Sequence, residues 1–251
     1  MRLLLLIAAL IWAVEALAQG KFTEIWEPVC TLGQDAGAGC DAIRAREVID
    51  AAQTPWRAIG RVNFAGLRQR SHCTGVLVSD RYVLTAAHCL YNMDRKSWIP
   101  ASSIRFAAGY QRGEAAALST VANYRLAAGQ NVNGAFDRRA ELDWAILELS
   151  EPIGLEVGFL PIVSDAKAGT VAGYPGLRSH VLSRTNSCEP HSVSHELIQA
   201  ICPVMMGDSG APLLVHTDEG LGVAAILSRI APTPGGIAAL FLSVDLFDQV
   251  P

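Results

Sequence analysis

The stretch Cys202-Pro203-Val204-Met205-Met206-Gly207-Asp208-Ser209-Gly210-Ala211-Pro212 places a serine directly after an aspartate and between two glycines. Gly207 and Gly210 allow the backbone to turn sharply and leave room for a substrate to approach. Such a turn can direct the N–H groups of Gly207 and Ser209 at one point, where they would stabilise the oxyanion of an acyl-transfer intermediate. Ser209 is therefore a candidate nucleophile, although a glycine-rich turn with a solvated serine fits this stretch equally well.

A serine nucleophile needs a base, and the base needs a group that orients it. Thr85-Ala86-Ala87-His88-Cys89 follows an apolar strand pattern and offers His88 as the base. Asp143 stands at the start of the otherwise apolar run Leu142-Asp143-Trp144-Ala145-Ile146-Leu147. A carboxylate there is costly to bury unless it is paired, and a histidine N–H is a suitable partner. We therefore predict catalytic roles for His88, Asp143 and Ser209.

The chain order His88, Asp143, Ser209 and the three local motifs resemble the chymotrypsin/trypsin-like serine proteases, whose triad has these roles. The resemblance runs from about residue 55 to the C-terminus. It implies an all-β fold of two antiparallel six-stranded barrels, an active-site cleft between them and a short C-terminal helix at 245–250. Cys202 lies seven residues before Ser209, a spacing that is similar to the bacterial branch with the V8-type glutamyl endopeptidases.

Short strand patterns separated by turns continue from Trp56 onward, as expected of all-β barrels. We expect strands at 57–64, 74–78, 82–85, 104–108, 144–149, 170–173, 181–185, 197–202, 212–215 and 222–227. Glu151-Pro152-Ile153-Gly154 is the expected crossover between the barrels. The protease domain is thus predicted at 49–251, with its first barrel at about 49–150 and its second at about 151–251.

The first 18 residues have the pattern of a secretory signal peptide, with Arg2, an apolar run at 3–14 and the cleavage site Ala16-Leu17-Ala18. The apolar run is shorter than the roughly 20 residues that a membrane span requires. We therefore expect a secreted or periplasmic protein with no stable membrane association. Residues 19–48 are expected to form an N-terminal extension or propeptide.

The resemblance raises the hypothesis of a zymogen. In trypsin-like zymogens a freed apolar N-terminus inserts beside the aspartate that precedes the serine, which is Asp208 here. Arg44 and Arg46 offer processing sites. The candidate new N-termini are Ile43, Val48 and Ile49. The sequence leaves equally open that the extension stays attached and the nucleophile turn is ordered without cleavage.

All six cysteines follow the signal pattern, and an even number in an exported chain implies disulfides, with 15 possible pairings. Their spacing favours three local pairs, Cys73–Cys89, Cys188–Cys202 and Cys30–Cys40, of which the first is also the pair that the family typically has. No two cysteines have the spacing of a zinc knuckle. We expect no metal and no organic cofactor.

The composition, 51% hydrophobic and 18% charged residues in 251, suits one enzyme with a sizeable core. The net charge of −4 and the lack of a basic run argue against nucleic acid as a partner. We expect a monomer that acts on protein or peptide substrates. Asp94 and Asp137 compete with Asp143 for the triad, but each lies beside an arginine in a polar stretch. The remaining histidines are expected in loops or on the surface: His72, His180, His191, His195 and His216.

Two positions predict the preference for the P1 residue, the one before the scissile bond. Basic-specific relatives carry an acidic residue six positions before the serine, which is Pro203 here, and glutamyl enzymes carry a threonine where Val204 stands. A substrate carboxylate there would lose its hydration without compensation. We therefore expect small or medium apolar P1 residues, and the predicted pocket residues are Val204, Met206, Ala224, Ala225 and Ile226.

Two other functions use a similar scaffold or a similar triad. A catalytically silent secreted binding module on a protease scaffold remains the alternative. The α/β-hydrolase esterases are excluded because their G-x-S-x-G motif is absent around Ser209 and their nucleophile comes first in the chain.

Overall fold

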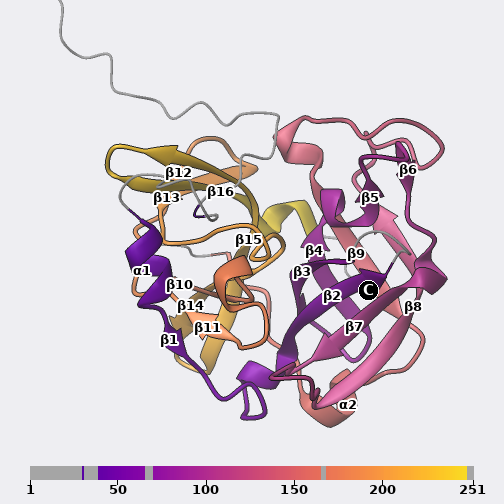
Figure 1. Ribbon diagram of the computed structural model, residues 1–251, viewed down its shortest axis with the longest axis horizontal. Coiled ribbons are helices and arrows are strands. Elements are labelled where there is room, and N and C mark those ends of the chain that lie inside the picture. The colour runs from indigo at the N-terminus through magenta and orange to yellow at the C-terminus, as the bar shows by residue number, and fades with distance from the viewer. Residues whose placement is uncertain (1–29, 31–38, 66–69, 165–167, 248–251) are drawn as a thin grey trace, which may run out of the picture.

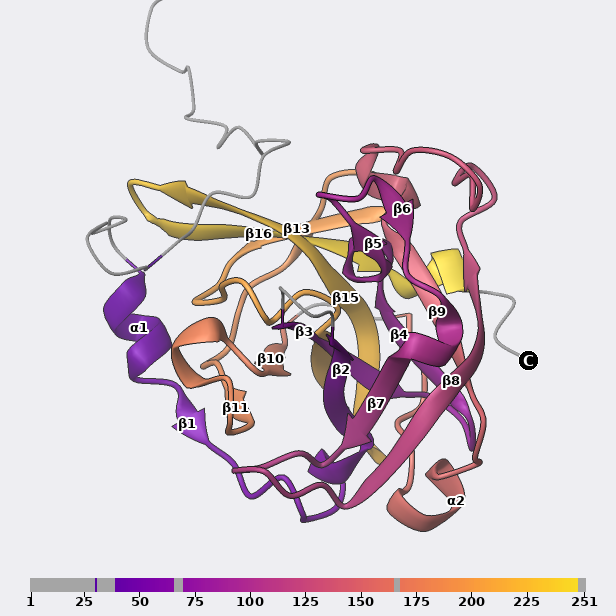
Figure 2. The ribbon, with the colours of Figure 1, turned by 45° about the vertical axis from the view of Figure 1, so that its right-hand side comes forward.

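The computed structural model describes residues 30, 39–65, 70–164 and 168–247. The predicted signal peptide at 1–18 lies outside these residues, as does most of the segment 19–38. The described chain forms two β-sheet halves that lie side by side in both Figure 1 and Figure 2. The protein is therefore mostly β, as predicted.

The first sheet is a closed barrel of six antiparallel strands in the order β2-β3-β4-β9-β8-β7. Its strands are β2 (Ile59–Ala65), β3 (Arg70–Leu77), β4 (Tyr82–Ala86), β7 (Ile104–Ala108), β8 (Ala117–Leu126) and β9 (Trp144–Leu149). Fully buried apolar side chains fill its interior, among them Val62, Val76, Leu84, Phe106 and Leu147. Closure leaves no strand edge unpaired, so short strands of this kind form a stable unit.

The second sheet has eight strands in the order β1-β11-β10-β14-β15-β16-β13-β12. They are β1 (Glu47–Val48), β10 (Thr170–Gly173), β11 (Ser183–Arg184), β12 (His191–Ser192), β13 (Leu197–Ile201), β14 (Pro212–Thr217), β15 (Gly220–Thr233) and β16 (Gly236–Ser243). Within the described residues this sheet is not closed by hydrogen bonds, which differs from the expected second six-stranded barrel. The difference arises at the edges, where the short strands β1 and β12 are added.

The remaining elements are short. They are α1 (Cys40–Arg44), α2 (Gly154–Val157), β5 (Tyr91–Asn92), β6 (Ser97–Trp98) and the 3-10 turns η1 (Trp56–Ala58), η2 (Ala87–Leu90), η3 (Ala101–Ser103), η4 (Ala140–Leu142), η5 (Gly176–Arg178) and η6 (Val244–Phe247). The expected helix at 245–250 is thus a single 3-10 turn at η6, and 248–250 lie outside the described residues. None of the helices in the described ranges has the length and apolar composition needed to cross a bilayer.

Each expected strand overlaps an observed one, but two long strands were not expected. β16 has eight consecutive buried residues, so it lacks the alternation that marks a half-exposed strand. β8 has that alternation, with Ser119 and Val121 buried between exposed neighbours, and its pattern was overlooked beside the glycine-rich loop that follows.

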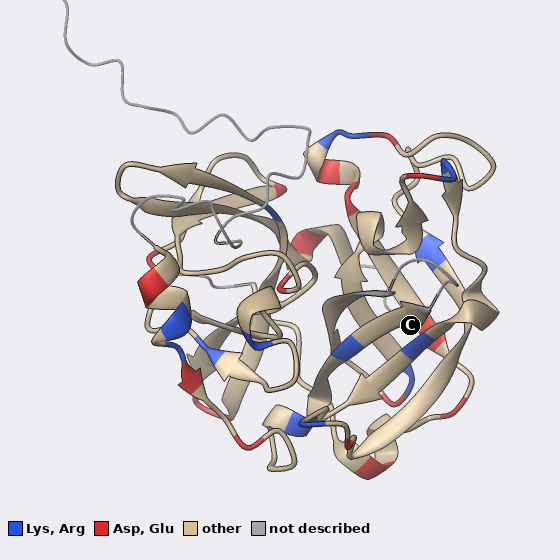
Figure 3. Cartoon of the chain, in the orientation of Figure 1, with Lys and Arg blue, Asp and Glu red and all other residues tan. Residues whose placement is uncertain are grey.

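The two halves meet where β15 lies against β4. In Figure 2 the long β15 curves from the second sheet towards the first barrel. Figure 3 shows charged residues of both signs scattered over the chain, while β13, β15 and β16 are largely uncharged. The loops that meet at the junction of the two halves carry the residues described next.

Candidate active site

Neighbouring strands of the first barrel bring His88 and Asp143 together. β4 and β9 pair antiparallel with Ala86 opposite Trp144, so the residues just beyond this pair lie close to one another. His88 Nδ1 lies 2.8 Å from Asp143 Oδ2, and the backbone N–H of His88 donates to Asp143 Oδ1 at 2.8 Å. His88 is 8% exposed and Asp143 is 1% exposed. The pair therefore holds one tautomer of the imidazole, with the proton on Nδ1.

A third donor reaches the same carboxylate from the second sheet. The Ser228 hydroxyl donates to Asp143 Oδ2 at 2.6 Å. A buried carboxylate with three hydrogen-bond donors is well compensated for its lost hydration. Sequence reasoning missed Ser228, which is a single hydroxyl after the apolar stretch 222–227 and lies where the β15–β16 register shifts, between Leu227 and Arg229.

The nucleophile turn has the shape expected from its glycines. Gly207 has φ +95° and Gly210 has φ +78°. A Cβ on Gly207 would lie 2.4 Å from the Tyr174 carbonyl oxygen, and one on Gly210 would lie 2.3 Å from the Thr74 carbonyl oxygen. Only glycine fits such positions. Among the described residues, neither the Gly207 N–H nor the Ser209 N–H has a hydrogen-bond acceptor, so both are available to a ligand.

Thr74 of β3 ties this turn to the first barrel. Its hydroxyl donates to the Gly207 carbonyl oxygen at 2.8 Å, and its backbone N–H donates to the Ser209 carbonyl oxygen at 2.9 Å. Thr74 is fully buried. It is a second residue that sequence reasoning did not single out, because nothing near it in the sequence indicates a partner 133 positions away.

His88, Gly207 and Ser209 all line one cavity of about 260 Å³ between the two sheets. The other lining residues are Phe64, His72, Cys73, Cys89, Tyr91, Asn92, Met93, Asp94 and Met206. The cavity is mostly apolar, which suits the burial of substrate side chains. A substrate carbonyl placed there would lie near Ser209, His88 and Gly207.

The predicted pocket walls are only partly at this cavity. Met206 lines it. The other four predicted residues do not line it, and all are buried to 2% exposure or less: Val204, Ala224, Ala225 and Ile226. Ala225 and Ile226 pair with Leu213 and Pro212 of β14. Further along β15, Ser228 contacts Asp143.

The structure contains the three disulfides Cys30–Cys40, Cys73–Cys89 and Cys188–Cys202, the pairs that the spacing favours. Cys89 Sγ lies 3.6 Å from His88 Nε2, so the bridge to Cys73 fixes the base of the loop that carries His88. Cys73, His88 and Cys89 are the one group with metal-ligand spacing among the described residues. Both sulfurs are in the disulfide, which leaves no thiolate to bind a metal there.

The expectation that His72 is a surface histidine is wrong. Its ring is half-buried at the cavity, and Nε2 lies 2.9 Å from the Tyr174 carbonyl oxygen. Burial lowers the pKa of His72 to about 4, and the Tyr174 carbonyl partly opposes this shift. The other four histidines of that group are exposed, as expected: His180, His191, His195 and His216.

The two competing aspartates have ordinary surroundings. Asp137 forms an ion pair with Arg139 at 3.1 Å on the surface, and this hydrogen-bonded arginine lowers the pKa of the Asp137 carboxyl. Asp94 is exposed at the rim of the cavity. Asp143, in contrast, is 1% exposed and lies 2.8 Å from His88 Nδ1.

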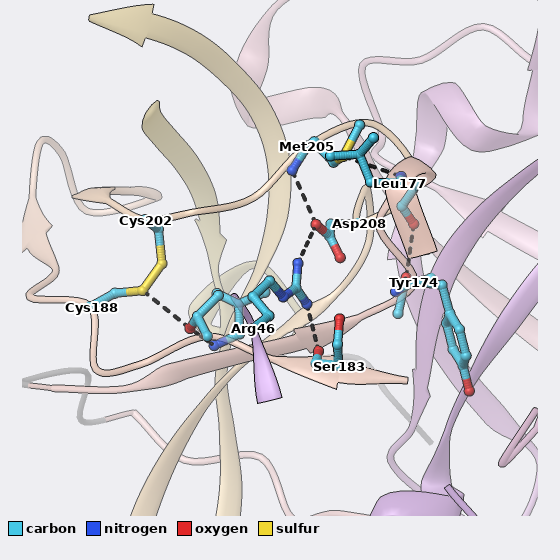
Figure 4. Close-up of polar contacts among 12 residues, drawn as sticks. Arg46, Tyr174, Leu177, Ser183, Cys188, Cys202, Met205 and Asp208 are labelled. Atoms are coloured by element: carbon cyan, nitrogen blue, oxygen red, sulfur yellow. Dashed lines mark hydrogen bonds and ion pairs between the residues drawn. A yellow bond between two sulfur atoms is a disulfide. The ribbon is translucent and has the colours of Figure 1, made fainter. Parts of the chain in front are cut away.

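Asp208 has an unexpected partner. In the uncleaved chain, Arg46 Nη1 lies 2.7 Å from Asp208 Oδ2, with both side chains fully buried. Burial raises the pKa of the Asp208 carboxyl, and the Arg46 guanidinium opposes that shift. Figure 4 shows Arg46, which directly precedes β1, reaching towards the turn that carries Asp208.

Comparisons with known proteins show the family and the fold. The family model described as Trypsin matches residues 47–241. No curated protein matches the sequence.

Three solved structures share the fold. A Glu endopeptidase has a TM-score of 0.65 at 19% identity, over 81% of this chain and 94% of its own. The thermostable serine protease AL20 from an extremophilic microorganism has a TM-score of 0.59 at 20% identity, over 74% of this chain and 91% of its own. The protease Anisep from Arthrobacter nicotinovorans has a TM-score of 0.60 at 17% identity, over 76% of this chain and 92% of its own.

Proposed function

We propose that this chain, which belongs to the trypsin family and is a serine endopeptidase, cleaves peptide bonds through His88, Asp143 and Ser209. The observation that carries the proposal is the arrangement at the cavity. His88 is held by Asp143 at 2.8 Å and lines the same cavity as Ser209. The expected triad order in the sequence supports the same assignment.

In the proposed reaction, His88 Nε2 takes the Ser209 hydroxyl proton while Ser209 Oγ attacks the substrate carbonyl carbon. Asp143 keeps the other imidazole proton on Nδ1 and stabilises the imidazolium. The N–H groups of Gly207 and Ser209 stabilise the negative oxygen of the tetrahedral intermediate. His88 then gives its proton to the leaving amine, and water, activated by the same imidazole, hydrolyses the acyl-enzyme.

The substrates are proteins or peptides, as the family implies. For P1 we propose a small or medium apolar side chain. Pro203 and Met206, both partly exposed on the segment before Ser209, offer apolar surface and no carboxylate to pair with a basic residue. Burial of an apolar side chain gains roughly 25 cal/mol per Å². A peptide library tests this: a preference for Glu, Lys or Arg at P1 would contradict it.

Export is also proposed. The signal pattern at 1–18 and three disulfides are both expected of a protein that folds in an oxidising compartment.

The decisive experiment is reaction with a fluorophosphonate, followed by peptide mapping and an assay of peptide hydrolysis. We expect the label on Ser209 and hydrolysis that stops in proportion to labelling. Labelling of another residue, or none, would overturn the triad assignment. A protein that labels at Ser209 but cleaves no peptide would favour the binding-module alternative.

A further inference from the structure

A fully buried ion pair joins the N-terminal segment to the nucleophile turn. Arg46 Nη1 and Asp208 Oδ2 lie 2.7 Å apart, and both side chains are 0% exposed. The two residues are 162 positions apart in the chain. Charges at such depth are retained only where each compensates the other, because removing one leaves the other without water or counter-charge.

Asp208 organises the turn that precedes Ser209. Its Oδ2 accepts a second hydrogen bond, from the Met205 N–H at 3.0 Å, and its own N–H donates to the Met205 carbonyl oxygen at 3.0 Å. The carboxylate thus closes the turn over residues 205–208, which carries the Gly207 N–H. The position of that N–H depends on where the Asp208 side chain lies.

Arg46 is itself held from several sides (Figure 4). Its Nη2 donates to the Ser183 carbonyl oxygen at 2.5 Å. Its carbonyl oxygen accepts from Arg178 Nη1 at 2.9 Å, and Arg178 also donates to the Arg44 carbonyl oxygen. Immediately after Arg46, β1 pairs with β11. The guanidinium is therefore aimed at Asp208 by a fixed backbone.

The segment before Arg46 belongs to the core of the second sheet. Ile43 is fully buried and packs in the same cluster as Ile237 and the Cys30–Cys40 disulfide. Gly39 lies so close that a Cβ there would be 2.9 Å from the Ile237 side chain. Loss of the chain up to and including Arg46 would expose that apolar surface and remove the charge that faces Asp208.

We propose that Arg46 is a positioning residue of the active site, whose guanidinium holds Asp208 and thereby the Gly207 N–H in place within the uncleaved chain. The proposal rests on the proposed function and extends it. It replaces the hypothesis of a freed N-terminus at Ile43, Val48 or Ile49, because an internal side chain already neutralises Asp208. The segment from Cys30 to Arg46 then remains in the active enzyme.

Without Arg46, the Asp208 carboxylate would be buried and unpaired, and it would turn towards water. That movement would pull the turn at 205–208 out of place. His88 and Asp143 lie in the first barrel and would keep their contact. The variant should therefore lose the stabilisation of the oxyanion by the Gly207 N–H, while the fold and the His88–Asp143 pair persist.

The test compares full-length, oxidised wild type with Arg46→Met, Arg46→Lys and the control Arg44→Met. Arg44 lies in the same segment but pairs with the exposed Asp41 on the surface. We expect kcat for peptide hydrolysis to fall by about 100- to 1,000-fold in Arg46→Met, the loss typical of one oxyanion donor. KM should change much less, Arg46→Lys should be intermediate, and Arg44→Met should match wild type.

Two readouts separate positioning from a general loss of structure. A further variant, Arg46→Ala, should lose activity as Arg46→Met does, and its shorter side chain leaves space for a guanidinium ion. Added guanidinium should restore part of the activity of Arg46→Ala and none of the activity of Ser209→Ala. Hydrogen–deuterium exchange should rise in the peptide that covers 203–211 in Arg46→Met, with the first barrel unchanged.

Three outcomes would overturn the inference. They are wild-type kcat in Arg46→Met, unchanged exchange at 203–211, or an active wild-type enzyme whose N-terminal sequence begins after Arg46. If wild type itself neither labels at Ser209 nor hydrolyses peptides, the proposed function fails, and the exchange data still decide whether Arg46 orders the turn.

Discussion

Thr74 Oγ1 donates to the Gly207 carbonyl oxygen at 2.8 Å, so a strand of the first barrel fixes the turn that carries Ser209, the proposed nucleophile. Thr74 Oγ1 also accepts a hydrogen bond from the Tyr174 N–H at 3.1 Å. One buried hydroxyl thus joins three segments around the active site. Its two hydrogen bonds fix the position of the second half relative to His88.

Replacement of Thr74 by valine tests this link. Thr74→Val keeps the shape of the side chain but leaves a buried carbonyl and a buried N–H unpaired, at a cost of about 1–3 kcal/mol for each group. We expect a lower free energy of unfolding and a lower kcat. Denaturant titration and peptide hydrolysis measure the two effects. Thr120→Val, at an exposed hydroxyl that contacts Ser150, is the matched control and should change neither.

The triad assignment predicts losses that do not add. Ser209→Ala and His88→Ala should each reduce kcat by roughly a million-fold, because the residues of a triad act as a unit. The double variant should lose little more than either single one. Circular dichroism should show the wild-type fold in all three. Amidase activity retained by Ser209→Ala would contradict the assignment.

Ser228 should contribute less than the triad but measurably. Ser228→Ala removes one of the hydrogen bonds to the buried Asp143 carboxylate, which is worth about 1.5–3 kcal/mol for a charged acceptor. We expect the free energy of unfolding to fall by up to this amount and kcat/KM to fall roughly 10- to 100-fold. Ser243→Ala is the control, since its hydroxyl contacts Asp245 away from the triad. Equal activities of the two variants would show that Ser228 does not orient the pair.

The sequence allowed prediction of the features that are local. His88, Asp143 and Ser209 each stand in a short motif that indicates a catalytic role without knowledge of the fold. The three disulfides join cysteines that are close in the chain. Ser228, Thr74 and Arg46 could not be found in this way, because their partners lie 85, 133 and 162 positions away.

The pairing register of β15 was also not predictable from the sequence. The sequence does not show that β15 shifts register twice, once against β14 and once against β16. Ala224, Ala225 and Ile226 stay predicted pocket residues, and they do not line the cavity at His88. A bulge adds a residue on one strand and changes which side chains face a cavity. Nothing in the run of apolar residues at 222–227 marks where such a shift occurs.

His72 provides the last prediction, which concerns pH. Burial holds the pKa of His72 at about 4 in the folded protein, against about 6.5 in the unfolded chain. Nearby Arg61 and His180 lower it further, while the Tyr174 carbonyl opposes the shift. Between these two values the unfolded state binds more protons than the native state. The free energy of unfolding therefore decreases as pH falls from about 6.5 to about 4, and the loss is complete below 4.

His72→Gln keeps an amide N–H for the Tyr174 carbonyl but cannot titrate, so it should lack this part of the pH dependence. The difference between wild type and His72→Gln should grow towards acid pH, to at most about 3 kcal/mol, since the half-buried ring keeps some solvent. Urea titrations from pH 7 to pH 4 measure it. His216→Gln, at an exposed histidine, should stay parallel to wild type throughout. Parallel curves for His72→Gln as well would show that His72 is protonated in the folded protein as easily as in the unfolded chain.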